Sequence, residues 1–132
     1  MKKLLLTVLM SGITGMASAD IVPGKTYRIA SAANEERVMF VDNSSFANNT
    51  SIVMWTDTEV PAQQWEAIAN DNGTFSFRNV FTGKYLARNS AVISTNSKIQ
   101  QTASTSSMGQ WNVDAVDGHD GYYVITQSSA SN

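Results

Sequence analysis

Few residues of this chain have the type and spacing that acid, base or metal chemistry requires. His119 is the only histidine, and it stands in the turn sequence DGHDG at 117–121. Asp114, Asp117 and Asp120 are spaced by three around it, but the ligand pattern of a calcium-binding loop is incomplete. We therefore expect a solvated histidine in an acidic turn and no metal site.

Catalytic groups are equally sparse. Glu35 and Glu36 are adjacent, so on a strand their side chains point to opposite faces and make a poor acid–base pair. The sequence contains no Gly-x-Ser-x-Gly, no His-Glu-x-x-His and no phosphate loop. It also has no cysteine, which excludes thiolate chemistry and disulfides. These absences predict a protein that is not an enzyme and uses no cofactor.

The residue best suited to bind something is Trp55, in the segment SIVMW at 51–55. If Ile52 and Met54 alternate toward the interior of a strand, Trp55 faces away from it. An outward tryptophan invites a functional explanation. The C–H face of a sugar ring packs on an aromatic ring, and its hydroxyls need a carboxylate and amides nearby. Sugar contact is one interpretation, and packing against a neighbouring domain or repeat is the other.

The N-terminus predicts an export signal. Lys2 and Lys3 precede an apolar stretch, and ASA precedes Asp20, which favours cleavage after Ala19 and a secreted or periplasmic protein. A membrane anchor is disfavoured because Ser, Gly and Thr interrupt the apolar run. Without Lys2 and Lys3, the 9 basic side chains become 7 against 11 acidic ones, a net charge of −4. This charge argues against nucleic-acid and membrane partners.

Repetition organises the remainder of the chain. Aromatic and aliphatic markers recur at 46 to 48 residues: Tyr27, Phe75 and Tyr123; Ile29, Phe77 and Ile125; Ile52 and Ile99; Trp65 and Trp111. Around these markers apolar and polar residues alternate, which predicts strands with one buried face. The turn sequences NDNG at 70–73 and DGHDG precede the next strand in each case. A period of this length indicates a repeat architecture.

The segments QQW, GTFSFRNVFTGKYL and GQWNV resemble the ricin-type β-trefoil lectin domains, whose three repeats each end in Gln-x-Trp. The resemblance covers residues 24–132. It implies an all-β trefoil domain over 20–132, with repeats at 24–69 and 73–116 and a partial third repeat at 121–132. Because the sequence stops 12 residues into that repeat, we expect an incomplete trefoil and favour a truncated chain.

In such a fold, one large aromatic from each repeat fills the interior of the barrel. We therefore expect Trp65 and Trp111 to be structural, with each indole N–H bonded to a partner. Gln63 is favoured as structural too, because its amide can satisfy turn backbone with both ends.

The resemblance also implies where a sugar site would lie. An active repeat of the family supplies an Asp, an aromatic about 15 residues later, and Asn or Gln near the closing triplet. In repeat one the family's Asp and Asn positions hold Phe40 and Ala62. Asp42 and Asn43, which follow Phe40, would substitute for them through a shifted loop. The predicted carbohydrate-binding residues are Asp42, Asn43, Trp55 and Gln63. In repeat two the positions of the Asp, the aromatic residue and the Gln hold Ala87, Thr102 and Gly109, so we expect no site there.

These observations favour a secreted, non-catalytic carbohydrate-binding module with at most one degenerate site, whose partner is a glycan or polysaccharide. The alternative is a structural or protein-interaction trefoil. A third possibility is an accessory part of a larger secreted glycoside hydrolase, with an adjoining catalytic domain.

Overall fold

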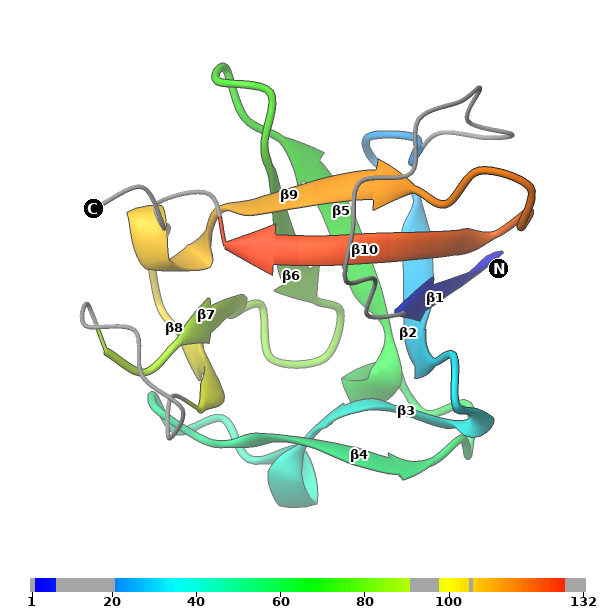
Figure 1. The fold of residues 1–132 in the computed structure, drawn as a ribbon. Coiled ribbons are helices and arrows are strands. Elements are labelled where there is room, and N and C mark those ends of the chain that lie inside the picture. Colours follow the sequence, from blue (N-terminus) through cyan, green and yellow to red (C-terminus); the bar gives the residue numbers. More distant parts are fainter. Residues whose placement is uncertain (1, 7–20, 91–97, 105, 128–132) are drawn as a thin grey trace.

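The computed structural model describes residues 2–6, 21–90, 98–104 and 106–127 (Figure 1). Its strands are β1 (Lys2–Leu6), β2 (Thr26–Ser31), β3 (Asn34–Val41), β4 (Ile52–Thr56), β5 (Trp65–Ala69), β6 (Phe75–Asn79), β7 (Tyr85–Arg88), β8 (Ile99–Thr102), β9 (Trp111–Ala115) and β10 (Tyr122–Gln127). Three short 3-10 turns join them: η1 (Asp42–Ser44), η2 (Pro61–Gln63) and η3 (Ser107–Gly109). In the described part of the chain, no helix has the length and apolar character needed to cross a membrane.

The strands form two similar units and the start of a third. In the first unit β3 and β4 pair as a hairpin, while β2 and β5 pair with each other. In the second, β7 and β8 form the hairpin and β6 pairs with β9. β10 pairs with β9 in the position that opens a third unit. The fold is therefore an all-β trefoil, as the sequence predicts, and β10 is the described strand of its third repeat.

Cross-strand pairing confirms the repeat period. Tyr27 of β2 lies opposite Trp65 of β5, and Phe75 of β6 lies opposite Trp111 of β9. The same pair of positions thus meets in both repeats, although the partners are 38 and 36 residues apart along the chain.

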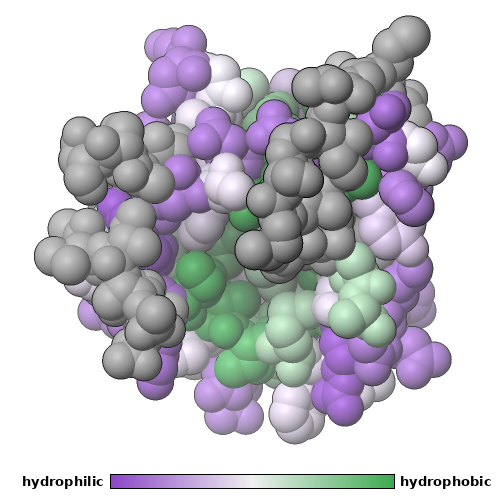
Figure 2. Space-filling model, viewed as in Figure 1, coloured by the Kyte–Doolittle hydropathy of each residue, from purple (hydrophilic) through white to green (hydrophobic). Residues whose placement is uncertain are grey.

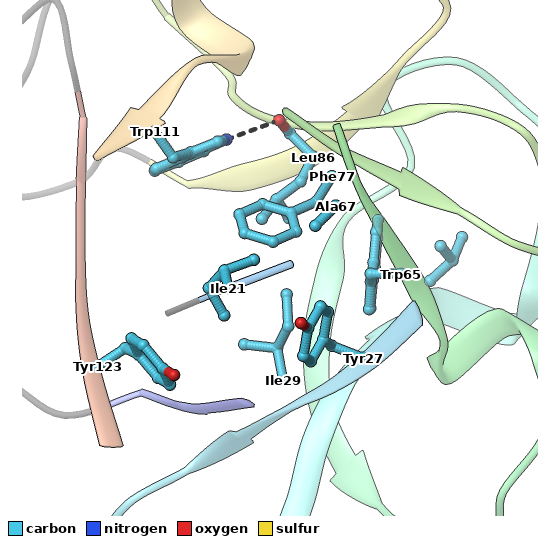
Figure 3. Close-up of a cluster of buried hydrophobic side chains, with 10 residues drawn as sticks. Ile21, Tyr27, Ile29, Trp65, Ala67, Phe77, Leu86, Trp111 and Tyr123 are labelled. Carbon is cyan, nitrogen blue, oxygen red and sulfur yellow. Dashed lines mark hydrogen bonds between the residues drawn. The ribbon is translucent and has the colours of Figure 1, made fainter. Parts of the chain in front are cut away.

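Both triplet tryptophans lie in the core (Figure 3). Trp65 is fully buried and its Nε1 donates to the carbonyl of Met39 at 3.1 Å. Trp111 is 7% exposed and its Nε1 donates to the carbonyl of Leu86 at 2.9 Å. The predicted structural role of both residues is confirmed. The other buried members of the cluster are Ile21, Tyr27, Ile29, Val41, Ala67, Phe77, Leu86 and Tyr123.

A left-handed glycine precedes the first strand of each repeat. Gly24, Gly73 and Gly121 have φ of 84°, 83° and 84°. A β-carbon at Gly73 would meet no atom within 4 Å, so a substitution there is opposed by backbone strain alone. We expect Gly73→Ala to lower the free energy of unfolding by about 1–2 kcal/mol. Urea denaturation measures the loss. Gly73→Asn should cost less, because Asn tolerates this conformation, and equal losses would contradict the backbone explanation.

The N-terminal segment takes part in the sheet. β1 lies between β2 and β10 and runs parallel to both (Figure 1). The sequence predicts that residues 2–6 belong to a signal that is removed, and in that case this arrangement is confined to the unprocessed chain. The predicted cleavage point at Ala19 lies outside the described residues, and its use remains a prediction.

Candidate functional site

The β3–β4 hairpin turns Trp55 away from the core. Val41 and Ile52 lie opposite each other on the core face, and Val38 lies opposite Trp55 on the other face. Trp55 is 54% exposed, the orientation that alternation along the strand predicts. Phe40 lies opposite Val53 on the Trp55 face, where an active family member would carry its aspartate. This part of the face is therefore apolar.

The structure does not bring Asp42 beside Trp55. The backbone N–H of Asp42 donates to the carbonyl of Ser51 at 3.1 Å, which places Asp42 at the end of the hairpin where β4 begins. Trp55 is four residues farther along, or about 13 Å at the rise of a strand. Asp42 and Asn43 are both exposed, but they form the opposite end of the hairpin surface.

Asn43 has a local reason for its identity. Its φ is 53°, in the left-handed region where Asn is enriched among residues other than glycine. The side chain therefore helps the chain to turn from β3 into η1, whether or not it also contacts a ligand.

Gln63 is fully buried and holds the loop that follows β4. Its Oε1 accepts a hydrogen bond from the backbone N–H of Thr58 at 2.9 Å, and its Nε2 donates to the carbonyl of Thr56 at 2.8 Å. Both ends of the amide are thus used on the backbone, which is the structural role that the sequence favours. Gln63 therefore contributes to the surface around Trp55 by positioning this loop, while its own side chain is not accessible to solvent.

That loop carries a charged group that the sequence analysis missed. Asp57 follows Trp55 by two residues, so their Cα atoms are about 7 Å apart. Asp57 forms an ion pair with Arg28 of β2, and its Oδ1 accepts from the N–H of Glu59 at 3.0 Å. The two-residue spacing from Trp55 could have drawn attention to Asp57. Its ion-pair partner Arg28, however, is 29 residues away and meets it only in the folded chain.

The Arg28–Asp57 pair is partly shielded from water. The side chains of Arg28 and Asp57 are 20% and 12% exposed. The Nε of Arg28 is buried and has no hydrogen-bond partner among the described residues. The loop that begins two residues after Trp55 thus has its carboxylate fixed on a guanidinium, and both groups can hydrogen-bond hydroxyls. No group of three or more metal-ligating side chains occurs in the described ranges.

A second polar contact supports the same sheet. Tyr122 packs on Val38, the cross-strand partner of Trp55, and its hydroxyl donates to Oε2 of Glu35 at 2.6 Å. This hydrogen bond raises the pKa of Tyr122 above its ordinary value. A tyrosine is protonated at neutral pH in any case, so the phenol can donate this hydrogen bond there and join β10 to β3.

Repeat two offers no equivalent surface. Ala87 is buried, and Thr102 stands where the first repeat has Trp55. Gly109 corresponds to Gln63, and a β-carbon there would lie 3.3 Å from the Leu86 carbonyl oxygen. The close approach explains the absence of a side chain, so the amide that holds the loop in repeat one is missing here.

Known proteins with the same fold match the chain. A family model described as ricin-type beta-trefoil lectin domain-like matches residues 61–132. The Rhizoctonia solani agglutinin has 16% identity and a TM-score of 0.70 over 84% of this chain and 73% of its own. ThreeFoil, a designed threefold-symmetric protein, has 24% identity and a TM-score of 0.62 over 69% of this chain and 64% of its own.

An enzyme also contains a similar domain. The exo-β-1,3-galactanase 1,3Gal43A of Clostridium thermocellum has 27% identity and a TM-score of 0.64 over 69% of this chain. The matched region is 20% of the galactanase chain. A search of curated proteins gave no match.

Proposed function

Because the chain belongs to the ricin-type β-trefoil lectin-like domains, we propose that it is a carbohydrate-binding module and performs no chemistry itself. Its ligand is a glycan or polysaccharide, and its place of action is outside the cytoplasm, as the N-terminal signal predicts. The galactanase that shares the fold suggests a galactan as the first ligand to test, and an adjoining or separate glycoside hydrolase as a partner.

The observation that carries the proposal is the exposed indole of Trp55 two residues before Asp57, whose carboxylate is fixed in an ion pair with Arg28. Sugar rings need one apolar surface and a few hydrogen-bonding groups whose geometry is set in advance. Trp55 supplies the surface, while Arg28 and Asp57 supply donors and acceptors that are held by one another. Gln63 fixes the loop that carries Asp57, so little ordering remains to be done on binding.

The hairpin favours an extended ligand over a single sugar. Asp42 and Asn43 lie about 13 Å from Trp55 along the strand, which is farther than one ring can reach. In our proposal a chain of several sugars stacks on Trp55 at one end and meets Asp42 and Asn43 at the other. The single aromatic contact makes binding weak, so the module acts mainly by keeping a partner enzyme near its substrate.

We expect Trp55→Ala to weaken binding to β-1,3-galactan about 30-fold, the equivalent of about 2 kcal/mol for an aromatic anchor. Affinity electrophoresis in gels that contain the polysaccharide measures this, and calorimetry with β-1,3-linked oligosaccharides confirms it. Phe46→Ala is the matched control, because Phe46 is 56% exposed and Trp55 is 54% exposed. It should leave binding unchanged.

Two further variants separate the parts of the site. Asp57→Asn should weaken binding, whereas Asp42→Asn should affect oligosaccharides and leave galactose binding unaltered. If the unchanged protein binds neither galactan nor a panel of other plant and microbial polysaccharides, the carbohydrate proposal is wrong.

A structural or protein-interaction role is the second candidate. The observation in its favour is the apolar character of the Trp55 face, where Phe40 replaces the family aspartate. A protein partner would cover Trp55 and Phe40 together. Two results together would favour this candidate: the unchanged protein binds no polysaccharide, and it binds a protein partner whose binding is lost in the Trp55→Ala variant.

A further inference from the structure

The pairing of β3 with β4 continues one residue beyond β4 and fixes the face on which Asp57 lies. Val38 pairs with Trp55 within the hairpin. The backbone N–H of Asp57 donates to the carbonyl of Glu36 at 2.8 Å, which extends the same register by two residues on each strand. Because side chains two residues apart on a strand share a face, Asp57 lies on the face of Trp55, and Glu36 lies on that of Val38.

The carboxylate of Asp57 is largely committed to the protein. Its Oδ2 accepts from Nη1 of Arg28 at 2.5 Å, and its Oδ1 accepts from the backbone N–H of Glu59 at 3.0 Å. The side chain is only 12% exposed. Both carboxylate oxygens thus have partners, and Asp57 offers a ligand little accessible surface. Its contacts instead fix the positions of Arg28 and Glu59.

Glu59 is the accessible carboxylate of this loop. Its side chain is 79% exposed, and its Oε1 lies 3.6 Å from Nη1 of Arg28. This distance is too long for a hydrogen bond, but it keeps the carboxylate beside the guanidinium. An exposed ion pair of this kind adds little to stability. The carboxylate of Glu59 can therefore turn to a ligand hydroxyl at little cost to the fold.

The backbone of Glu59 is in an unfavourable conformation. Its φ is 60°, in the left-handed region, which is uncommon for residues other than glycine and is adopted mostly by Asn, Asp or His. Two hydrogen bonds hold it there: its N–H donates to Asp57, and its carbonyl accepts from Nε2 of Gln64 at 3.4 Å. Such strain concentrates at ligand sites. The turn itself would accept Gly or Asn more readily, so it does not explain a glutamate here.

Negative charge outweighs positive charge on this face of the hairpin. Glu36, Asp57 and Glu59 contribute three carboxylates, and Arg28 contributes one guanidinium. Arg37 alternates with Glu36 along β3, so it belongs to the opposite face. Hydrophilic side chains gather at the lower right of Figure 2, where β4 ends in the view of Figure 1. An anionic ligand is repelled by these carboxylates, whereas an uncharged one is not.

We propose that Glu59 determines which sugars bind beside Trp55: its carboxylate accepts hydrogen bonds from the hydroxyls of an uncharged sugar and repels an anionic one. Asp57 and Arg28 are positioning residues that hold it. The inference rests on the carbohydrate-binding function proposed above and adds the class of ligand, an uncharged polysaccharide and not a uronic or sulfated one. A hydrogen bond to an ionised carboxylate is roughly twice as strong as one between neutral groups.

The test is calorimetry at low salt, with uncharged β-1,3-linked galacto-oligosaccharides and with oligogalacturonides as the anionic probe. Glu59→Gln keeps the shape of the side chain and removes its charge. We expect it to weaken binding of the uncharged oligosaccharide about tenfold and to narrow the preference over the oligogalacturonide at least about tenfold. Asp71→Asn is the charge-matched control, because it removes one negative charge from the exposed turn before β6. It should leave both affinities unchanged.

Urea denaturation separates a ligand-contacting role from a structural one. Glu59→Asn suits the left-handed backbone, so its midpoint should equal or exceed that of the unchanged chain. Asp57→Asn weakens the ion pair with Arg28 and should lower the midpoint. The inference is overturned if Glu59→Asn lowers the midpoint as far as Asp57→Asn does, or if Glu59→Gln binds the uncharged oligosaccharide as tightly as the unchanged chain. The second result leaves the carbohydrate function intact, whereas an unchanged chain that binds no polysaccharide overturns both proposals.

Discussion

Trp65→Ala is expected to lower the free energy of unfolding by about 3–5 kcal/mol. Trp65 of β5 is fully buried, and its cross-strand partner is Tyr27 of β2. Truncation removes the indole and leaves a cavity that the fixed strands cannot fill. It also deprives the Met39 carbonyl of its donor at 3.1 Å. Because domains of this size are stable by about 5–15 kcal/mol, most of the margin would be lost.

Urea denaturation followed by circular dichroism measures this effect, and Trp55→Ala is the control. It deletes the same atoms from a side chain that is 54% exposed, so the stability should change by no more than about 0.5 kcal/mol. Trp111→Ala should resemble Trp65→Ala, since its indole donates to Leu86 in the equivalent place. Similar losses for Trp55→Ala and Trp65→Ala would disprove the structural assignment.

Gln101→Ala is expected to cost about 2–4 kcal/mol, because it leaves buried polar groups without partners. Gln101 is fully buried, and its Nε2 donates to the carbonyls of Ser45 and Ala47 at 2.8 and 2.7 Å. Its Oε1 accepts from the hydroxyl of Thr82 at 2.9 Å. One amide thus ties the long loop of repeat one to the first turn of repeat two.

The adjacent Gln100 provides the matched control. Gln100 is half-buried, and its Nε2 donates to Oδ1 of Asn49 at 3.0 Å in a solvent-exposed hydrogen bond, so Gln100→Ala should change the stability by about 0.5 kcal/mol or less. Hydrogen exchange should also report the loss locally: in Gln101→Ala, amides of the loop at 45–50 should exchange faster than those of β5. Equal costs for the two substitutions would rule out the tie between repeats.

The sequence by itself determined the repeat period, the type of the elements and the tryptophans of the core. Each of these is encoded within one short segment or by its repetition: alternation predicts which face of a strand is buried, and recurrence of Gln-x-Trp marks equivalent places. For the same reason the outward orientation of Trp55 could be predicted from the inward position of Ile52, although Met54, expected to face inward too, is 38% exposed. The buried amide of Gln63 followed from the same logic.

The tertiary structure decided which distant residues meet. The strand register, and not the sequence spacing, separates Asp42 from Trp55 by the length of the hairpin. The pairing of Arg28 with Asp57 and the reach of Gln101 into repeat one depend on how strands 29 to 56 residues apart pack together. The position of β1 between β2 and β10 likewise depends on which backbone edges remain open after the other strands have paired. Such contacts arise from long-range pairing, for which a linear pattern carries no signal.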